Sequence, residues 1–452
     1  MTTINRPVLQ VAAEGPGASA HERPAADAAE LAGLFKRVGL RLIPFLFLCY
    51  VLNYIDRVNI SFAQLQFRSD LGLSEASYGL GVGVFYIGYV LFEVPSNLLL
   101  GRIGARKTIA RIMVLWGLVS MGMMLVQTPG QFYAARIALG IAEAGFFPGI
   151  IYYLNSWFPN RYRARVMSLF VLGIAVAGIT GGPVSGWILA HAEGWQQLHA
   201  WQWLFLIEGL PPVLAGCFAW FYLTDTPRQA HWLSEREKAL IGAALDAPAE
   251  GQAHKADSFR AALRTPKVYL CAFGYFTITW AGSVLNFWAP SIIRGAGVSN
   301  LWHVGLLSAI PYATGAVAML LISRHSDARQ ERVLHFSVLA LAAAAGAVGV
   351  AFQHDAFVPA IACLALLATG YLSCTAIFWT LPSTFLSGTA SVGAIALISS
   401  VGQLGSLSAP VAIGWLTSIT HEISAGSLLA AAVLTSGGLA IALFMRPARA
   451  GA

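Results

Sequence analysis

The strongest chemical signal in this sequence is a pair of opposite charges inside an apolar run. Asp56 and Arg57 lie near the end of the first long apolar segment, 38–62. A charged side chain at membrane depth costs at least ~2.5 kcal/mol, so both groups need polar surroundings. On a helix, the spacing i, i+3, i+4, i+7 places four side chains on one face: Tyr50, Asn53, Tyr54 and Arg57. We interpret this face as one wall of an aqueous cavity that offers Arg57 to an anion, with Asp56 beside it.

A second pair of charges lies in the apolar segment 131–155. Arg136 and Glu143 are seven residues apart, which places them on one helix face about two turns from each other. Burial raises the pKa of a carboxyl group and a nearby arginine lowers it, so Asp56 and Glu143 are candidates to bind and release protons. The alternative is a static salt bridge to Arg136. For Arg57, the alternative to anion binding is a structural ion pair with Asp56 or Glu143.

Two further acidic residues, Glu93 and Glu208, lie near the ends of apolar segments. There we expect roles in interfacial structure. A run of glycines, among them Gly178, Gly182 and Gly186, lies in the segment 166–190. We interpret it as a surface for close helix packing.

The composition identifies the elements that position these residues. The chain is 57% hydrophobic and 11% charged, whereas a soluble protein carries about a quarter charged residues. Apolar runs long enough to cross a ~30 Å hydrocarbon core predict twelve transmembrane helices. They cover 38–62, 76–99, 109–127, 131–155, 166–190, 203–223, 268–293, 303–323, 333–353, 357–380, 389–418 and 425–445. We therefore predict an all-α membrane protein.

The basic residues indicate the topology. Of the 28 Lys and Arg, 24 lie in the tails and loops of one face, and only Arg68 and Arg294 lie in loops of the other. The positive-inside rule then predicts that both termini and the central loop are cytoplasmic. The basic balance does not imply a nucleic-acid partner. The five cysteines lie within predicted spans without paired or metal-type spacing, so we expect neither a metal nor a cofactor.

The chain divides into two halves of six helices. Residues 1–35 resemble a disordered cytoplasmic tail, followed by an N-terminal half over 36–223, a central loop over 224–266 and a C-terminal half over 267–446. Ser234 and Glu237 form a capping box that predicts a short surface helix in the central loop. The charged loop 323–332 repeats the position of the loop 101–107, which is typical of a duplicated transporter with its site between the halves.

Five sequence pieces together resemble a known family: 53–59 (NYIDRVN), 143–149 (EAGFFPG), 157–159 (WFP), 225–233 (DTPRQAHWL) and 379–382 (WTLP). They are similar to the major facilitator superfamily, and most of all to its anion:cation symporter family of tartrate, sugar-acid and aromatic-acid carriers. The resemblance runs from about Leu40 to Phe444. The superfamily usually has an Asp in the first basic loop where this chain has Gly101, whereas the second copy of the loop keeps Asp327.

The resemblance implies a role for each site residue. Arg57 would bind the substrate carboxylate, Asp56 and Glu143 would carry protons, and Arg136 would pair with these carboxylates. The rest of the substrate pocket would come from aromatic and amide side chains: Tyr54, Tyr89, Asn286, Trp379 and Gln403. Most Trp and Tyr residues are expected to be interface anchors or packing residues, and Trp288 is a further candidate for the pocket.

We therefore expect a multi-pass inner-membrane symporter, and not an enzyme, that imports a small organic carboxylate with protons by alternating access. A tartrate-like hydroxy-dicarboxylate, a sugar acid and an aromatic acid fit equally well. The alternatives are a drug or metabolite exporter of the same superfamily, a non-transporting membrane sensor and a membrane enzyme. The expected partners are the organic anion, protons and the lipid bilayer, and we expect a monomer.

Overall fold

The computed structural model of this chain describes residues 22–246, 264–353, 356–382, 385 and 388–445. In this part of the chain, twelve helical segments are long and apolar enough to cross a membrane. They agree with the twelve predicted spans to within a few residues at most ends. The first half contains α1 (Glu22–Val58), α2 (Ile60–Asp70), α3 (Glu75–Ile103), α4 (Ala105–Gly122), α5 (Pro129–Glu143), α6 (Phe146–Asn155), α7 (Asn160–His191) and α8 (Ala200–Tyr222).

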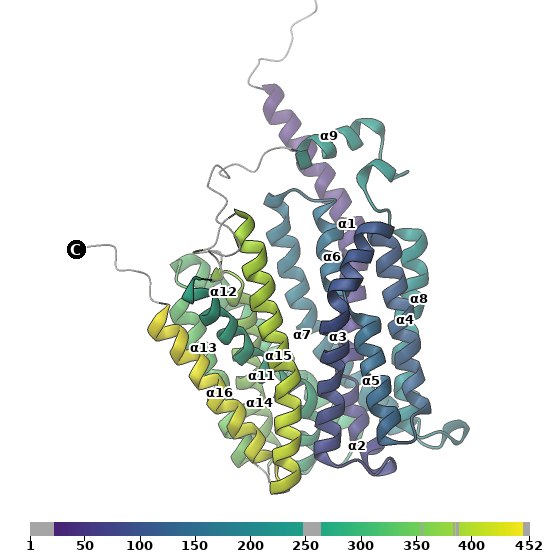
Figure 1. Cartoon of the computed structure of the whole chain (residues 1–452), viewed down its shortest axis with the longest axis vertical. Coiled ribbons are helices and arrows are strands. Elements are labelled where there is room, and N and C mark those ends of the chain that lie inside the picture. The colour runs from purple at the N-terminus through teal and green to yellow at the C-terminus, as the bar shows by residue number, and fades with distance from the viewer. Residues whose placement is uncertain (1–21, 247–263, 354–355, 383–384, 386–387, 446–452) are drawn as a thin grey trace, which may run out of the picture.

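The second half lies beside the first, with the surface helix α9 (Glu235–Asp246) at one end of the molecule (Figure 1). It contains α11 (Pro266–Gly295), α12 (Leu301–Arg329), α13 (Val333–Phe352), α14 (Phe357–Phe378), α15 (Gly388–Thr420) and α16 (Ile423–Phe444). We call the end that carries α9 and the loops 101–107 and 323–332 the basic end. The other end is the opposite end.

Helix α1 starts earlier than the sequence analysis expected. It begins at Glu22, so the second part of the predicted disordered tail is helical, while residues 1–21 lie outside the described residues. Leu34 and Phe35 are buried, and the Phe35 ring lies 6.1 Å from that of Phe158. The reason is helical spacing, since Leu31, Leu34, Phe35 and Val38 follow the i, i+3, i+4, i+7 pattern of one apolar face.

The predicted surface helix in the central loop is confirmed as α9. The Glu237 amide donates to Ser234 Oγ (3.3 Å) and the Ser234 amide donates to Glu237 Oε2 (2.9 Å), which is the expected capping box. The hydrogen bond from the Ser234 amide lowers the pKa of Glu237. Ion pairs Arg37–Glu237 and Arg236–Glu30 join α9 to the start of α1, so the first part of the central loop is held against the first half.

Two membrane spans are divided next to the charged residues, and one of them is broken. The first span passes from α1 to α2 at Asn59, two residues after Arg57, where the backbone stays helical. The fourth changes from α5 to α6 at Gly145, two residues after Glu143. Gly145 has φ +86°, and a Cβ there would lie 2.6 Å from Ser96 Oγ, so the break requires glycine. Backbone groups freed at a break need new partners, which favours polar side chains nearby.

The two halves meet closely at the opposite end. A Cβ on Gly79 of α3 would lie 2.3 Å from the Pro410 carbonyl oxygen of α15. A Cβ on Gly186 of α7 would lie 2.7 Å from the Gly305 Cα of α12. The interpretation of the glycines in 166–190 as a packing surface is confirmed, and Gly178, Gly182 and Gly186 pack against α12 of the other half. The halves are therefore closed together at the opposite end.

Candidate functional site

A cavity of about 190 Å³ lies between the two halves. Its wall is formed by side chains of both halves, from α1, α3, α6, α7, α11, α14 and α15. The residues of the predicted helix face all line it, as do most of the predicted pocket residues: Tyr50, Asn53, Tyr54, Arg57, Tyr89, Asn286, Trp379 and Gln403. The cavity lies where the duplicated architecture places a transport site.

Arg57 lies at the wall of this cavity and forms an ion pair with Glu143. The Arg57 side chain is 19% exposed and that of Glu143 is 1% exposed. The guanidinium carbon lies 5.4 Å from the ring centres of both Phe85 and Tyr89, within cation–π distance. The positive charge therefore faces the cavity but has a buried carboxyl group of the protein as its partner.

Asp56 points away from the cavity. It is 1% exposed, and its Oδ1 accepts hydrogen bonds from Asn59 Nδ2 (3.0 Å) and from Ser120 Oγ of α4, while Oδ2 has no partner. This position agrees with the 100° turn that separates neighbouring residues on a helix. Asp56 is therefore inside the first half, whereas Arg57 faces the boundary between the halves.

Arg136 is buried between the two carboxyl groups without a direct ion pair to either. Its Nε donates to the Gly81 carbonyl oxygen (3.2 Å), and the described residues include no carboxylate within 4.0 Å of its guanidinium. Its guanidinium carbon lies 5.0 Å from the Phe85 ring, which also contacts Arg57. Glu143 and Asp56 are close enough to interact with it electrostatically. Arg136 therefore acts on them through its field.

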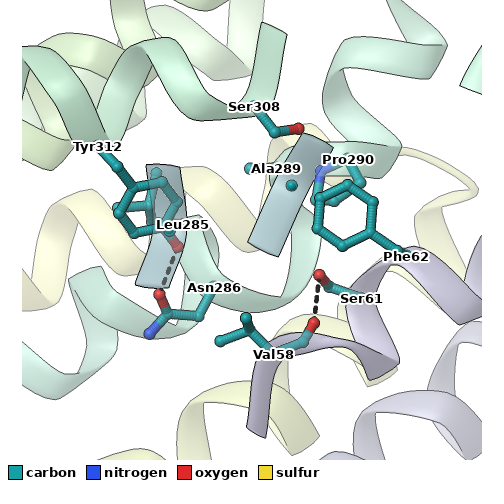
Figure 2. Close-up of a pocket in the computed structure, with 11 residues that line it drawn as sticks. Val58, Ser61, Phe62, Leu285, Asn286, Ala289, Pro290, Ser308 and Tyr312 are labelled. Carbon is teal, nitrogen blue, oxygen red and sulfur yellow. Dashed lines mark hydrogen bonds between the residues drawn. The ribbon is translucent and has the colours of Figure 1, made fainter. Parts of the chain in front are cut away.

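A hydrogen-bond network joins the halves at the inner end of the cavity. Asn286 Nδ2 donates to Tyr54 Oη (2.8 Å), Tyr312 Oη donates to Asn286 Oδ1 (2.7 Å), and the hydroxyls of Tyr54 and Tyr371 are 3.3 Å apart. Figure 2 shows Asn286 and Tyr312 at a second, much smaller cavity of about 10 Å³ beyond the network. Such a space is about one water molecule in size. The network thus separates the substrate-sized cavity from the closed opposite end.

Trp288 was expected in the pocket and does not line the central cavity. It is 1% exposed, and its ring centre lies 5.7 Å from that of Tyr78. Two residues correspond to a turn of about 200° on a helix, so Trp288 and Asn286 cannot face the same side. The sequence analysis expected both in the pocket, and the structure places the Trp288 side chain in the core instead.

The second half contributes an aromatic wall. The Tyr275 ring centre lies 5.1 Å from that of Phe378 and 4.9 Å from that of Trp379. Tyr275, Trp379 and Gln403 all line the cavity. This half therefore offers flat rings and hydrogen-bonding groups to the cavity.

The sequence analysis missed several residues of the cavity. Glu93 lines it, together with Tyr86, although Glu93 was expected to have an interfacial role. Tyr86, Tyr89 and Glu93 follow the spacing i, i+3, i+7 of one helix face, which is a signal that was present in the sequence. The other lining residues that were missed are Phe147, Ile174, Tyr275, Ile278, Thr279, Gly282, Ser283, Phe287, Tyr371, Thr375, Ser399 and Ser406.

Comparison with known proteins shows the family. Residues 46–410 match the family model described as Major Facilitator Superfamily. The chain belongs to the major facilitator superfamily. This transporter is 43% identical, over 83% of its length and 86% of the relative's, to the putative metabolite transport protein NicT of Pseudomonas putida. It is 40% identical, over 92% and 95% of the two chains, to a putative tartrate transporter of Agrobacterium vitis.

The fold agrees with this membership. The transporter superposes with a TM-score of 0.71 on the partially occluded inward open structure of the xylose transporter XylE from E. coli, at 14% identity and over 91% and 99% of the two chains. The family resemblance inferred from the motifs and the twelve-helix fold class are therefore confirmed. The protein is a multi-pass secondary transporter and not an enzyme.

Proposed function

We propose that this transporter imports a small organic carboxylate together with protons by alternating access. The observation that carries the proposal is the ion pair between Arg57 and Glu143 at the cavity wall. An arginine can hold a carboxylate with two parallel hydrogen bonds. Here the guanidinium faces a cavity large enough for an organic acid, and its partner is a carboxyl group that can take a proton.

The pair supports a simple coupling rule. A substrate carboxylate and the Glu143 carboxylate compete for the same guanidinium, and a buried cation or anion left without a partner is strongly destabilising. When Glu143 binds a proton, Arg57 is free to bind the substrate and the site stays neutral. When the substrate leaves, Glu143 loses its proton and pairs with Arg57 again. Substrate and proton therefore bind together and are released together.

The charges of the cavity favour a substrate with a single carboxylate. Among the described residues that line it, Arg57 is the only cation, and Glu93 adds a negative charge. A second carboxylate on the substrate would have no cation and would face Glu93, which is unfavourable in a site of low dielectric. The remainder of the substrate can be flat or hydroxylated, because it would contact the rings of Tyr275 and Trp379 and the amide of Gln403. The alternative substrate class is a dicarboxylate, because one relative is named a putative tartrate transporter.

The direction of transport follows from the proposed topology. With 24 of 28 basic residues on one face, the basic end lies in the cytoplasm of an inner membrane. In the state described here the halves are closed at the opposite end, so the cavity serves the cytoplasmic side. A proton gradient directed inward then drives import.

A thermal-shift screen of the purified transporter tests the substrate class. The panel contains aromatic monocarboxylates, sugar acids, tartrate, neutral sugars and cationic drugs. A ligand at 100 times its Kd adds ~2.7 kcal/mol to the free energy of unfolding, which such a screen detects. We expect monocarboxylates to stabilise the wild type and not Arg57→Ala. The control is Arg68→Ala, which removes an ion pair with Glu75 outside the cavity and should respond like the wild type.

Uptake into proteoliposomes tests the coupling. The ligand found in the screen should accumulate only when an inward proton gradient is present. Accumulation that survives collapse of the gradient would refute proton symport. Stabilisation of both wild type and Arg57→Ala by cations alone would refute anion binding and favour the drug exporter, for which Glu93 would then be the counter-charge.

A further inference from the structure

Glu208 is a buried carboxyl group that the proposed mechanism does not yet use. It lies in α8 and was expected at a water interface, but it is only 6% exposed. Its Oε1 accepts a hydrogen bond from Ser185 Oγ of α7 (2.6 Å), and its buried Oε2 has no hydrogen-bond partner among the residues that the structure describes. A buried carboxylate with one donor and no cation is strongly destabilising, whereas the protonated acid is not.

The position of Glu208 couples it to Asp56. Asn59, which donates to Asp56 Oδ1 (3.0 Å), also interacts with Glu208, and Asp56 and Glu208 act on each other electrostatically. Asn59 is 1% exposed and lies between α1 and α2. Two buried carboxyl groups therefore lie near one amide that donates to Asp56, and each has one oxygen without a hydrogen-bond partner among the described residues.

The two carboxyl groups differ in their charged surroundings. Asp56 has Arg136 and Glu143 within electrostatic reach and accepts from Ser120 of α4. For Glu208, Asp56 is the charged group that acts on it from the elements packed around α8, and α7 contributes the neutral Ser185. The next titratable groups toward the opposite end are Asp70 and His199. Asp70 Oδ2 accepts a hydrogen bond from Trp201 Nε1 (2.8 Å), and His199 Nδ1 lies 3.5 Å from the same oxygen. Between the two carboxyl groups, the ionised form is thus better stabilised on Asp56.

Glu208 also lies on the path toward the opposite end. It is the ninth residue of α8, which begins at Ala200, so it lies about 12 Å from that end of the helix. Asp56 lies deeper, next to the central cavity wall formed by Arg57. A proton that enters the first half from the opposite end would therefore meet Glu208 before Asp56.

We propose that Glu208 is a proton-binding carboxyl group of the transport cycle and exchanges its proton with Asp56. The proton leaves the Glu208 carboxyl and binds the Asp56 carboxylate, so one negative charge moves from Asp56 to Glu208 and the pair keeps its total charge. The Asn59 amide donates to Asp56 and lies near Glu208. Glu208 then takes a new proton from the opposite end when the halves open there. This inference rests on the proposed proton coupling.

The test compares two activities of reconstituted Glu208→Gln. Glutamine keeps the shape of the side chain and its acceptor for Ser185, but it binds no proton. We expect substrate counterflow, which needs no net proton movement, to stay at the wild-type level, and accumulation driven by a proton gradient to be lost. The matched control is Glu75→Gln, which removes a carboxylate that pairs with Arg68 outside the buried cluster and should keep both activities.

The outcomes are distinguishable. If the wild-type protein shows no accumulation driven by a proton gradient, the proposed proton coupling itself is refuted. If the wild type accumulates substrate and Glu208→Gln does so equally well, only the role of Glu208 is refuted. Loss of both activities in a variant of wild-type thermal stability shows a structural role and also refutes it.

A second variant keeps the proposal testable if Glu208→Gln does not fold. Ser185→Ala keeps the carboxyl group and removes its donor. The pH profile of accumulation should move to higher pH because the ionised carboxylate is less stabilised. An unchanged profile contradicts the proposal.

Discussion

At the scale of single residues, the two arginines within the spans of the first half are stabilised in different ways. Arg57 neutralises its charge with Glu143, whereas Arg136 donates to the Gly81 carbonyl and remains near both carboxyl groups without touching them. Both guanidinium groups lie within cation–π distance of the Phe85 ring. The ring attracts both cations, so Arg57 can exchange partners while Arg136 continues to stabilise negative charge nearby.

The contrast between two tryptophans gives a prediction at this scale. Trp379 lines the cavity, so Trp379→Ala should weaken ligand binding with a small loss of stability. Trp288 is fully buried against Tyr78, so Trp288→Ala should lower the free energy of unfolding by about 3–5 kcal/mol. Thermal unfolding with and without the ligand separates the two effects. Equal loss of ligand stabilisation in both variants would contradict the assignment of Trp288 to the core.

At the scale of helices, the chain compensates for a departure from the superfamily pattern. Gly101 stands where an Asp is usual, and a Cβ there would meet no atom within 4 Å. A carboxylate reaches the same junction from elsewhere: Asp225 Oδ1 accepts from the Arg106 amide (2.8 Å) at the start of α4. Gly104 makes room for it, because a Cβ there would lie 2.6 Å from that oxygen. Asp225 thus caps α4 from the beginning of the central loop.

This cap predicts a stability effect without a binding effect. Asp225→Ala leaves the first turn of α4 without its acceptor and should cost about 1 kcal/mol, the usual size of a lost N-cap. Asp225→Asn keeps an acceptor oxygen and should cost less. Thermal unfolding measures the change, and the Kd for the ligand should stay constant. A large change in Kd with unchanged stability would show that the α3–α4 junction acts on the site instead.

At the scale of the whole molecule, closure at the opposite end depends on glycines in both halves. Gly79 meets α15 and Gly186 meets α12, and in both places the backbones approach too closely for a side chain. These contacts exist in the state described here and must separate when the cavity opens at the opposite end. Alternating access therefore requires that the two faces fit closely without being permanently joined.

A larger side chain at this contact should shift the transporter toward the state that is open at the opposite end. In Gly186→Val the valine side chain prevents the close contact with Gly305 and should hold the halves apart at the opposite end. We therefore expect that ligand binding persists while uptake is lost. A cysteine introduced at the buried Ser61, in a background without the native cysteines, should then react with a membrane-impermeant thiol reagent. The control is Gly122→Val, where a Cβ meets no atom within 4 Å. Normal uptake by Gly186→Val would contradict the closure model.

The sequence by itself determined the twelve spans and the helix face that carries Arg57. Both follow from local regularities: the length of apolar runs fixes what can cross a bilayer, and the spacing of Tyr50, Asn53, Tyr54 and Arg57 fixes which side chains point the same way. The surface helix α9 was equally predictable from its capping box. The family followed from motifs that are continuous in the chain.

Only the tertiary structure decided which partners these residues have. It paired Arg57 with Glu143, left Arg136 without a direct ion pair to any described residue, placed Trp288 in the core and buried Glu208 beside Ser185. The physical reason is that an ion pair or a buried acid depends on which helices pack together and at what rotation. Residues such as Arg57 and Glu143 are far apart in the sequence, and spacing within one helix carries no information about the face of another.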